Sequence, residues 1–297
     1  MPRLFQILLF LALTFQSAAN KDSLFVRKTV LVSGSAIISA GSLVGLNQLW
    51  YKPYSTGKFH VFNDNKEWLQ VDKIGHVYSC YQISRLLMNG FEKAGFTENK
   101  TMLYGGCAGF VYMTAIEFMD GYSSGWGFSW GDQFADGLGT GMAIAQYKFW
   151  HEQRIQLKFS FAKSGLAKYN PNLLGSSFNE QLLKDYNGQT YWLSVNPSAF
   201  MKKESRFPKW FNVCVGYAGY GMLGGHENRI LAQDPDGTVW KVERERRYYL
   251  SVDIDLSRLP IKNKILKGIC SWVQLVKIPA PALQFSNKGV RAYGFYF

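Results

Sequence analysis

The side chains best suited to chemistry lie between residues 64 and 143 of the 297-residue chain. They are a D-K-x-x-H motif and four later carboxylates, namely Asp72, Lys73, His76, Glu117, Asp120, Asp132 and Asp136. Carboxylate oxygens are the ligands that hard divalent cations prefer, and one imidazole nitrogen suits such a set. The first hypothesis is therefore a divalent cation held by His76, Glu117, Asp120, Asp132 and Asp136.

Two other uses of the same residues stay open. In a catalytic set, Asp72 would orient His76 as a general base and Lys73 would hold an anion such as a phosphate, with Glu117 and Asp132 completing the site. In a structural network, the lysine and the histidine would neutralise the acids and fix the register of tightly packed helices. Clustered ionisable groups favour a functional site without deciding between these hypotheses.

Three predicted helices must position these side chains. They cover about 64–89, 101–119 and 129–150, the last two ending near glycine or a bulky aromatic residue and the last beginning at a Ser129 cap. On a 3.6-residue period the charges share their helix faces with small and apolar residues. Because an unpaired buried charge is very costly, we expect the charges of the three helices to meet one another or a ligand.

Composition and charge narrow the setting. The chain has 22 Phe, 17 Tyr and 9 Trp, 47% apolar residues and a net charge of +12, which suits an anionic partner. Residues 1–19 predict a signal peptide, with Arg3, an apolar run and Ser17-Ala18-Ala19 before the cleavage site. Export disfavours nucleic acid and favours acidic lipid or another anionic envelope component. No lipobox cysteine is present, and the four cysteines form no C-x-x-C pair, so they predict no zinc or thioredoxin-type site.

The segment 29–50 carries no charged residue and is rich in glycine, serine and alanine. It is long enough to cross a bilayer, and its small residues suit close helix packing in membranes. The alternative is the central helix of a soluble bundle. With the three helices above, it predicts a helical bundle over residues 20–150.

After residue 150 the pattern changes to an antiparallel β region over 151–297. The predicted strands are 153–161, 190–195, 212–217, 239–242, 247–254 and 290–297, with a turn at Asp234-Pro235-Asp236-Gly237. Segment 261–277 predicts a basic amphipathic helix that either lies in a membrane interface or covers the sheet. The alternating end of the chain is typical of outer-membrane barrels or of an ordinary edge strand. Residues 201–297 hold 16 Lys/Arg and 8 Asp/Glu, a local charge of +8. The fold class is thus α+β.

Several stretches carry a resemblance to a known family. FNDNKEWLQVDKIGH, EFMDG, SWGDQFADGLG, KDYNGQTYWLSVNP and KIPAPAL resemble the long, Bacteroidota-like form of the YfiM-type "predicted periplasmic lipoprotein" family, whose function is unknown. A weaker resemblance is to VanZ-like membrane proteins, through Asp72, Lys73, His76, Glu117 and Asp132. There, Asp120 and Asp136 stand where that family has Gln and Asn, so the chain departs from it by adding acid.

These observations predict a protein of the cell envelope, in the periplasm or the outer membrane. The first function hypothesis is a non-enzymatic, membrane-associated structural protein that binds lipid or an envelope protein partner. The alternative is a VanZ-like membrane enzyme, or a metal- or phosphate-binding protein, that acts on a phosphorylated lipid or glycan.

Overall fold

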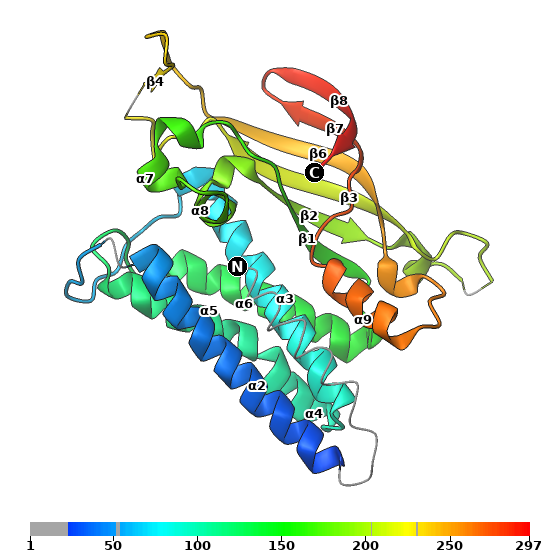
Figure 1. Cartoon of the computed structure of the whole chain (residues 1–297). Helices are drawn as coiled ribbons and strands as arrows, with labels where there is room; N and C mark the ends of the chain where they lie inside the picture. Colours follow the sequence, from blue (N-terminus) through cyan, green and yellow to red (C-terminus); the bar gives the residue numbers. More distant parts are fainter. Residues whose placement is uncertain (1–22, 52–53, 203, 230) are drawn as a thin grey trace. The chain divides into compact units, whose positions relative to one another are not determined.

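The computed structural model describes residues 23–51, 54–202, 204–229 and 231–297, so the predicted signal peptide lies outside the described residues. The fold is α+β, as the sequence predicts: helices come first and an antiparallel sheet follows (Figure 1). The chain divides into two compact units. The first, here called the helical unit, comprises the described residues of 23–64 and residues 79–153. The second, the sheet unit, comprises 65–78 and 154–297.

Within the residues that the structure describes, the helical unit contains four long helical segments (Figure 1). The first is almost free of charge, as expected. The third is a nearly continuous run in which a π-helix lies between two α-helical parts. In order they are α2 (Ser23–Leu46) with the π-turn η1 (Asn47–Tyr51); α3 (Val71–Lys93), whose residues from 79 onward belong to this unit; α4 (Glu98–Lys100), η3 (Thr101–Gly106) and α5 (Ala108–Tyr122); and α6 (Trp130–Trp150).

The second predicted helix begins later than its sequence indicates. Residues 64–70 do not form its first turns: Trp68, Leu69 and Gln70 have positive φ values of 47°, 51° and 63°, in the short turn η2 (Glu67–Gln70). Such backbone is unfavourable for bulky residues and persists only where surroundings hold it. Here the holding contacts are long-range: the Tyr217 hydroxyl donates to the Leu69 carbonyl, and the Trp68 amide donates to the Gly225 carbonyl at 2.9 Å.

The sheet unit is organised around one six-stranded antiparallel sheet in the order β1-β2-β3-β6-β7-β8 (Figure 1). Its strands are β1 (Ile155–Phe161), β2 (Gln189–Val195), β3 (Phe211–Tyr220), β6 (Glu245–Ile254), β7 (Ala280–Ser286) and β8 (Gly289–Tyr296). The predicted strand at 239–242 is instead β5 (Val239–Trp240), paired with β4 (Ala232–Gln233) around the Asp234–Gly237 turn. The last strand is an edge strand that pairs with β7.

Short helices lie in the connections before, between and after the strands of the sheet unit. They are η4 (Ala167–Tyr169), α7 (Pro171–Leu174), α8 (Phe178–Lys184), η5 (Tyr186–Gly188), η6 (Pro197–Phe200), η7 (Leu256–Arg258) and α9 (Lys264–Val273). The predicted amphipathic helix is thus shorter than expected. It begins after Asn263, whose side chain accepts from the amides of Ile265 and Leu266. The segment that follows it pairs with the free edge of β1, because Lys277 N donates to Phe159 O at 2.9 Å.

One face of the sheet forms a polar core. The Lys158 ammonium contacts the Asp253 carboxylate at 2.5 Å, and both side chains are fully buried. Lys158 also donates to Gln274 at 2.9 Å, and Ser194 donates to Asp253 at 3.0 Å. Asn212 then donates to Ser194 at 2.8 Å. Because each polar group meets a partner, burial of this network does not carry the cost of unsatisfied groups.

Candidate functional site

The start of α6 gathers carboxylates in the helical unit. Ser129 is 1% exposed and caps the helix, since its hydroxyl accepts from the Asp132 amide at 3.2 Å. This confirms the predicted cap. The Ser129 amide donates to the Glu117 carboxylate at 2.9 Å, and its hydroxyl donates to Asp64 at 2.6 Å. Glu117 is 1% exposed, so an acid of α5 is held beside the positive end of the α6 dipole, where negative charge is favoured.

Asp120 lies one turn beyond Glu117 on α5 and faces the end of η1. Its carboxylate accepts a hydrogen bond from Tyr51. Burial raises the pKa of the Tyr51 phenol, and the charges of Asp120 and Glu117 raise it further. The phenol therefore stays protonated and acts as a donor to the acid throughout the physiological range. Thr114 and Gln133, joined at 3.1 Å, tie α5 to α6 nearby.

Asp136 is fully buried, one turn after Asp132, which is 3% exposed. The Cys80 thiol of α3 donates to the Asp136 carboxylate at 3.3 Å. Burial raises the pKa of that thiol, and the neighbouring carboxylate raises it further, so Cys80 is a protonated donor and not a nucleophile. All four cysteines are free thiols. The predicted α6 face with Asp132, Asp136, Gly139 and Ala143 is buried along its length.

The D-K-x-x-H motif lies in the sheet unit, on the first turns of α3. The Asp72 carboxylate accepts from the Tyr186 hydroxyl at 2.5 Å and contacts the Lys73 ammonium at 3.3 Å. His76 is half-buried one turn later. α3 comes close to β2 here, since a Cβ at Gly75 would lie 2.9 Å from the Tyr191 hydroxyl. Burial raises the pKa of Tyr191, with smaller contributions from Tyr78 and Asp72.

The structure therefore brings together part of the predicted set in each unit. Glu117, Asp120, Asp132 and Asp136 line the buried sides of α5 and α6 in the helical unit. In the sheet unit, Asp72 forms an ion pair with Lys73 and accepts a hydrogen bond from Tyr186, and His76 follows on the same helix. The meeting of all three helices' charges at one site stays a prediction.

Sequence reasoning did not find several partners of these acids. Tyr51 and Tyr186 lie far from the acids in sequence and carry no motif of their own. Asp64 was predicted to cap the second helix, with Glu67 three residues later, but that helix begins at Val71 and Asp64 accepts from Ser129 instead. Ser129 was found through its spacing to Asp132, but its bonds to Glu117 and Asp64 depend on the packing of α5 and of the segment before η2. Among the partners of the acids, only Lys73 was indicated by a sequence motif, the D-K-x-x-H pattern.

The Ser129 cap yields a direct prediction. Ser129→Ala removes the acceptor of the Asp132 amide and the donor to Asp64, so the free energy of unfolding should fall by about 1–2 kcal/mol. Denaturant unfolding followed by circular dichroism measures it. The matched control is Ser124→Ala, because Ser124 makes only a surface contact with Ser55 at 3.0 Å. Equal losses for the two variants would contradict a capping role.

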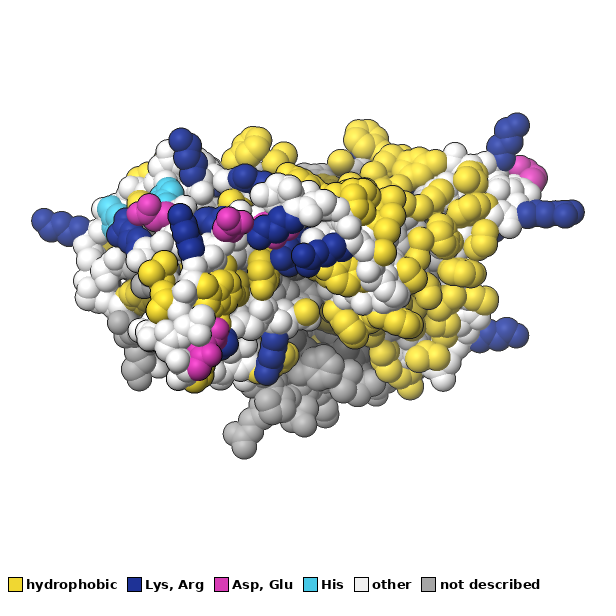
Figure 2. All heavy atoms as spheres, turned by 90° about the horizontal axis from the view of Figure 1, so that it is seen from above, with side chains coloured by type: hydrophobic (Ala, Val, Ile, Leu, Met, Phe, Trp, Pro, Cys, Tyr) yellow, Lys and Arg dark blue, Asp and Glu magenta, His cyan; other side chains and the backbone are white. Residues whose placement is uncertain are grey.

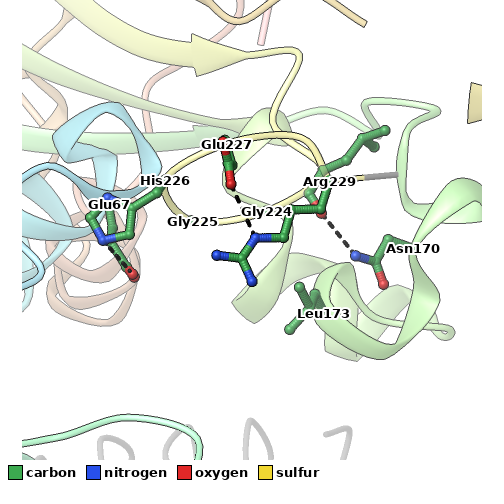
Figure 3. Close-up of a pocket in the computed structure, with 9 residues that line it drawn as sticks. Glu67, Asn170, Leu173, Gly224, Gly225, His226, Glu227 and Arg229 are labelled. Atoms are coloured by element: carbon green, nitrogen blue, oxygen red, sulfur yellow. Dashed lines mark hydrogen bonds and ion pairs between the residues drawn. The ribbon is translucent and has the colours of Figure 1, made fainter. Parts of the chain in front are cut away.

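A separate pocket lies in the sheet unit, with a volume of about 300 Å³ (Figure 3). Glu67 and His226 meet at 3.3 Å on one side of it, and Arg229 contacts Glu227 at 3.2 Å on the other. Arg244 fixes the backbone between them by donating to the Gly224 carbonyl at 2.7 Å and to that of Gly225. His226 is half exposed, so this pair is a solvated contact and not a buried catalytic pair.

Comparison with known proteins finds one family model that matches part of the chain. Residues 60–148 match the model of the family described as "Predicted periplasmic lipoprotein (DUF2279)". The resemblance seen in the sequence is confirmed. The match covers less than a third of the chain and includes every residue from the D-K-x-x-H motif to Asp136. The chain matches no curated protein and no solved structure. The match puts the chain in the cell envelope of its cell, as the sequence predicts, while the resemblance to VanZ-like proteins stays a prediction.

Proposed function

We propose that this envelope protein is a non-enzymatic, membrane-associated protein whose helical unit inserts its apolar helices into a bilayer. The observation that carries the proposal is the reversed polarity of this unit. Many of its exposed residues are large and apolar, whereas Glu117, Asp132 and Asp136 are buried. Large hydrophobic side chains that are at least one third exposed include Phe25, Ile37, Val44, Leu103, Val111, Phe118, Trp130, Phe134 and Phe149.

Among the described residues, two segments are long and apolar enough to cross a membrane. They are Leu24–Leu46, with a mean hydropathy of 1.8, and Glu98–Tyr122, with 1.2. Only 6% and 28% of their most apolar stretches are buried within the protein. A core helix of a soluble bundle would bury most of its apolar face. α2 instead buries Leu31 against Phe91 and Ala94 and leaves most of its other apolar residues exposed.

The buried acids are consistent with this proposal, because they form a polar interior within the helical unit. In hydrocarbon, ionisable groups are confined to the protein interior, where they meet one another or polar partners. Glu117 and Asp136 have such partners in the Ser129 amide and the Cys80 thiol. Gln82 and Arg85, joined at 2.8 Å, extend the same interior along α3. These contacts join α3, α5 and α6, which supports a structural role for the acids.

The test places a charge on the exposed side of α2. Ile37 is 72% exposed near the middle of the helix, where an inserted lysine costs about 2.5–3.5 kcal/mol. Ile37→Lys should therefore move most of the protein out of the carbonate-resistant membrane fraction. Val26→Lys is the matched control, because Val26 is 45% exposed near the helix end, where a lysine side chain reaches the interface.

The same fractionation also gives the result that would contradict the proposal. Recovery of the unmodified chain in the soluble periplasmic fraction would exclude insertion of α2. Equal membrane retention of both lysine variants would show that α2 is not within hydrocarbon.

A further inference from the structure

The six-stranded sheet buries a face of mixed polar and apolar residues and exposes a face that is largely apolar. Residues along each strand alternate between its two faces. On one face, strand pairing aligns Gln156, Ser194, Cys214 and Ser251 in a buried row. On the other face, it aligns Leu193, Val215, Leu250 and Leu283, which are 39%, 54%, 45% and 41% exposed.

Two more rows extend this outer face, here called the apolar sheet face. Val213 pairs with Val252, and Tyr248 pairs with Phe285, which pairs in turn with Val290. All five are between 37% and 64% exposed. Figure 2, the view from above, shows hydrophobic side chains gathered over the right half, with lysine and arginine side chains around them. Contiguous apolar surface of this kind marks an interaction site.

α9 also exposes apolar residues. Gln274 and Lys277, which follow α9 in the chain, are buried in the polar core, while Ile265, Ile269 and Trp272 of the helix are 50%, 42% and 39% exposed. An amphipathic helix that covers a sheet would turn these apolar residues inward. Lys262 and Lys267 are exposed beside them. Apolar and aromatic residues with lysines at their side are the composition of a helix that lies in a lipid interface.

The loop before β3 adds positive charge at the end of the apolar sheet face. Lys202, Arg206 and Lys209 are exposed there, together with Met201 and Trp210, which are 44% and 40% exposed. Residues 201–297 carry 16 Lys/Arg against 8 Asp/Glu. Basic residues near a bilayer surface each contribute about 1 kcal/mol of attraction to anionic headgroups. The charge therefore complements a lipid surface better than it complements a second copy of this basic chain.

We propose that the apolar sheet face and α9 rest on a bilayer that contains anionic phospholipid, with Lys202, Arg206 and Lys209 on the headgroups. This inference rests on the proposed function, because it gives a membrane-associated protein a second lipid contact, in its other unit. The sheet unit would then bind preferentially to anionic lipid, a selectivity that insertion of α2 does not provide.

The experiment uses the full-length protein with an environment-sensitive fluorophore on a new cysteine. Val215→Cys and Leu250→Cys place the probe on the apolar sheet face; Asn179→Cys, exposed on α8, is the matched control. The unsubstituted chain, labelled in parallel, gives the background from the native thiols. Probe emission and its quenching by aqueous iodide are compared with vesicles of phosphatidylethanolamine and phosphatidylglycerol and with neutral phosphatidylcholine vesicles.

With the anionic vesicles, the two sheet probes should shift to shorter wavelength and lose most of their quenching, while the Asn179 probe stays unchanged. Added salt should weaken the effect, because it screens the basic loop. Sheet probes that remain quenched beside anionic vesicles would overturn the inference. So would shielding without vesicles that grows with protein concentration, which would identify a second copy as the occupant.

The two lipid contacts fail in different ways. If α2 does not insert, the chain leaves the carbonate-resistant fraction, but the sheet probes still respond to anionic vesicles. If the apolar sheet face does not bind lipid, the chain stays membrane-bound and the sheet probes remain exposed.

Discussion

Lys158→Met should lower the stability of the sheet unit by about 3–5 kcal/mol, because it leaves a buried carboxylate without its cation. Lys158 and Asp253 are both inaccessible to solvent and their charged atoms lie 2.5 Å apart. Methionine keeps most of the side-chain volume, so the loss reports the charge and not a cavity. Hydrogen exchange of β1 and β6, measured by mass spectrometry, should rise strongly in the variant.

Two controls separate the ion pair from the substitution itself. Adding Asp253→Asn to Lys158→Met removes the stranded charge while keeping an acceptor for Ser194, so more than half of the loss should be recovered. Lys241→Met, at an exposed lysine, should change stability by less than about 0.5 kcal/mol. If Lys158→Met is as well tolerated as Lys241→Met, the buried pair contributes little.

Gly109→Ala should destabilise the helical unit by about 1–3 kcal/mol, because the added methyl group overpacks the contact between α5 and α3. A Cβ at Gly109 would lie 2.5 Å from the Cys80 carbonyl oxygen and 2.6 Å from the Ser84 hydroxyl. The carbonyl is backbone, so relief requires one helix to move. The melting temperature of the helical unit, followed by circular dichroism, should fall.

Gly137→Ala is the matched control with the opposite expected sign. Gly137 lies inside α6 with no neighbouring atom within 4 Å of an added Cβ. Alanine should raise stability there by about 1 kcal/mol, because it restricts the unfolded chain and favours the helix. A similar response at both glycines would show that α5 does not depend on close contact with α3.

Local signals predicted those elements whose ends are set by nearby residues. Ser129 and Asp132 gave the start of α6, and the Asp234–Gly237 turn gave the hairpin of β4 and β5. β7 was not predicted, because Pro279 and Pro281 indicate breaks. The strand accepts Pro281 at an irregularity in its pairing with β8, where no ladder amide is needed, and the Pro281 carbonyl accepts from Ser251 at 2.8 Å.

The candidate site was partly predictable for the same reason. The burial of Glu117, Asp132 and Asp136 follows from the small residues around them on a helical period. The turn at Trp68–Gln70 does not, because its positive φ values depend on Tyr217, Gly225 and Arg246, more than 145 residues away. That turn moves the beginning of α3 to Val71 and frees Asp64 to accept from Ser129.

The division of the chain has a consequence for biogenesis. Residues 65–78 belong to the sheet unit, but the rest of the sheet unit, 154–297, comes only after residues 79–153 of the helical unit. Val71 is fully buried with Tyr191 and Met222, and Asp72 accepts its hydrogen bond from Tyr186. During vectorial synthesis and export, this short segment must therefore stay accessible until some 150 further residues have emerged. A chain stopped after α6 would leave Val71 without Tyr191 and Met222, and the segment would be accessible to chaperones and proteases.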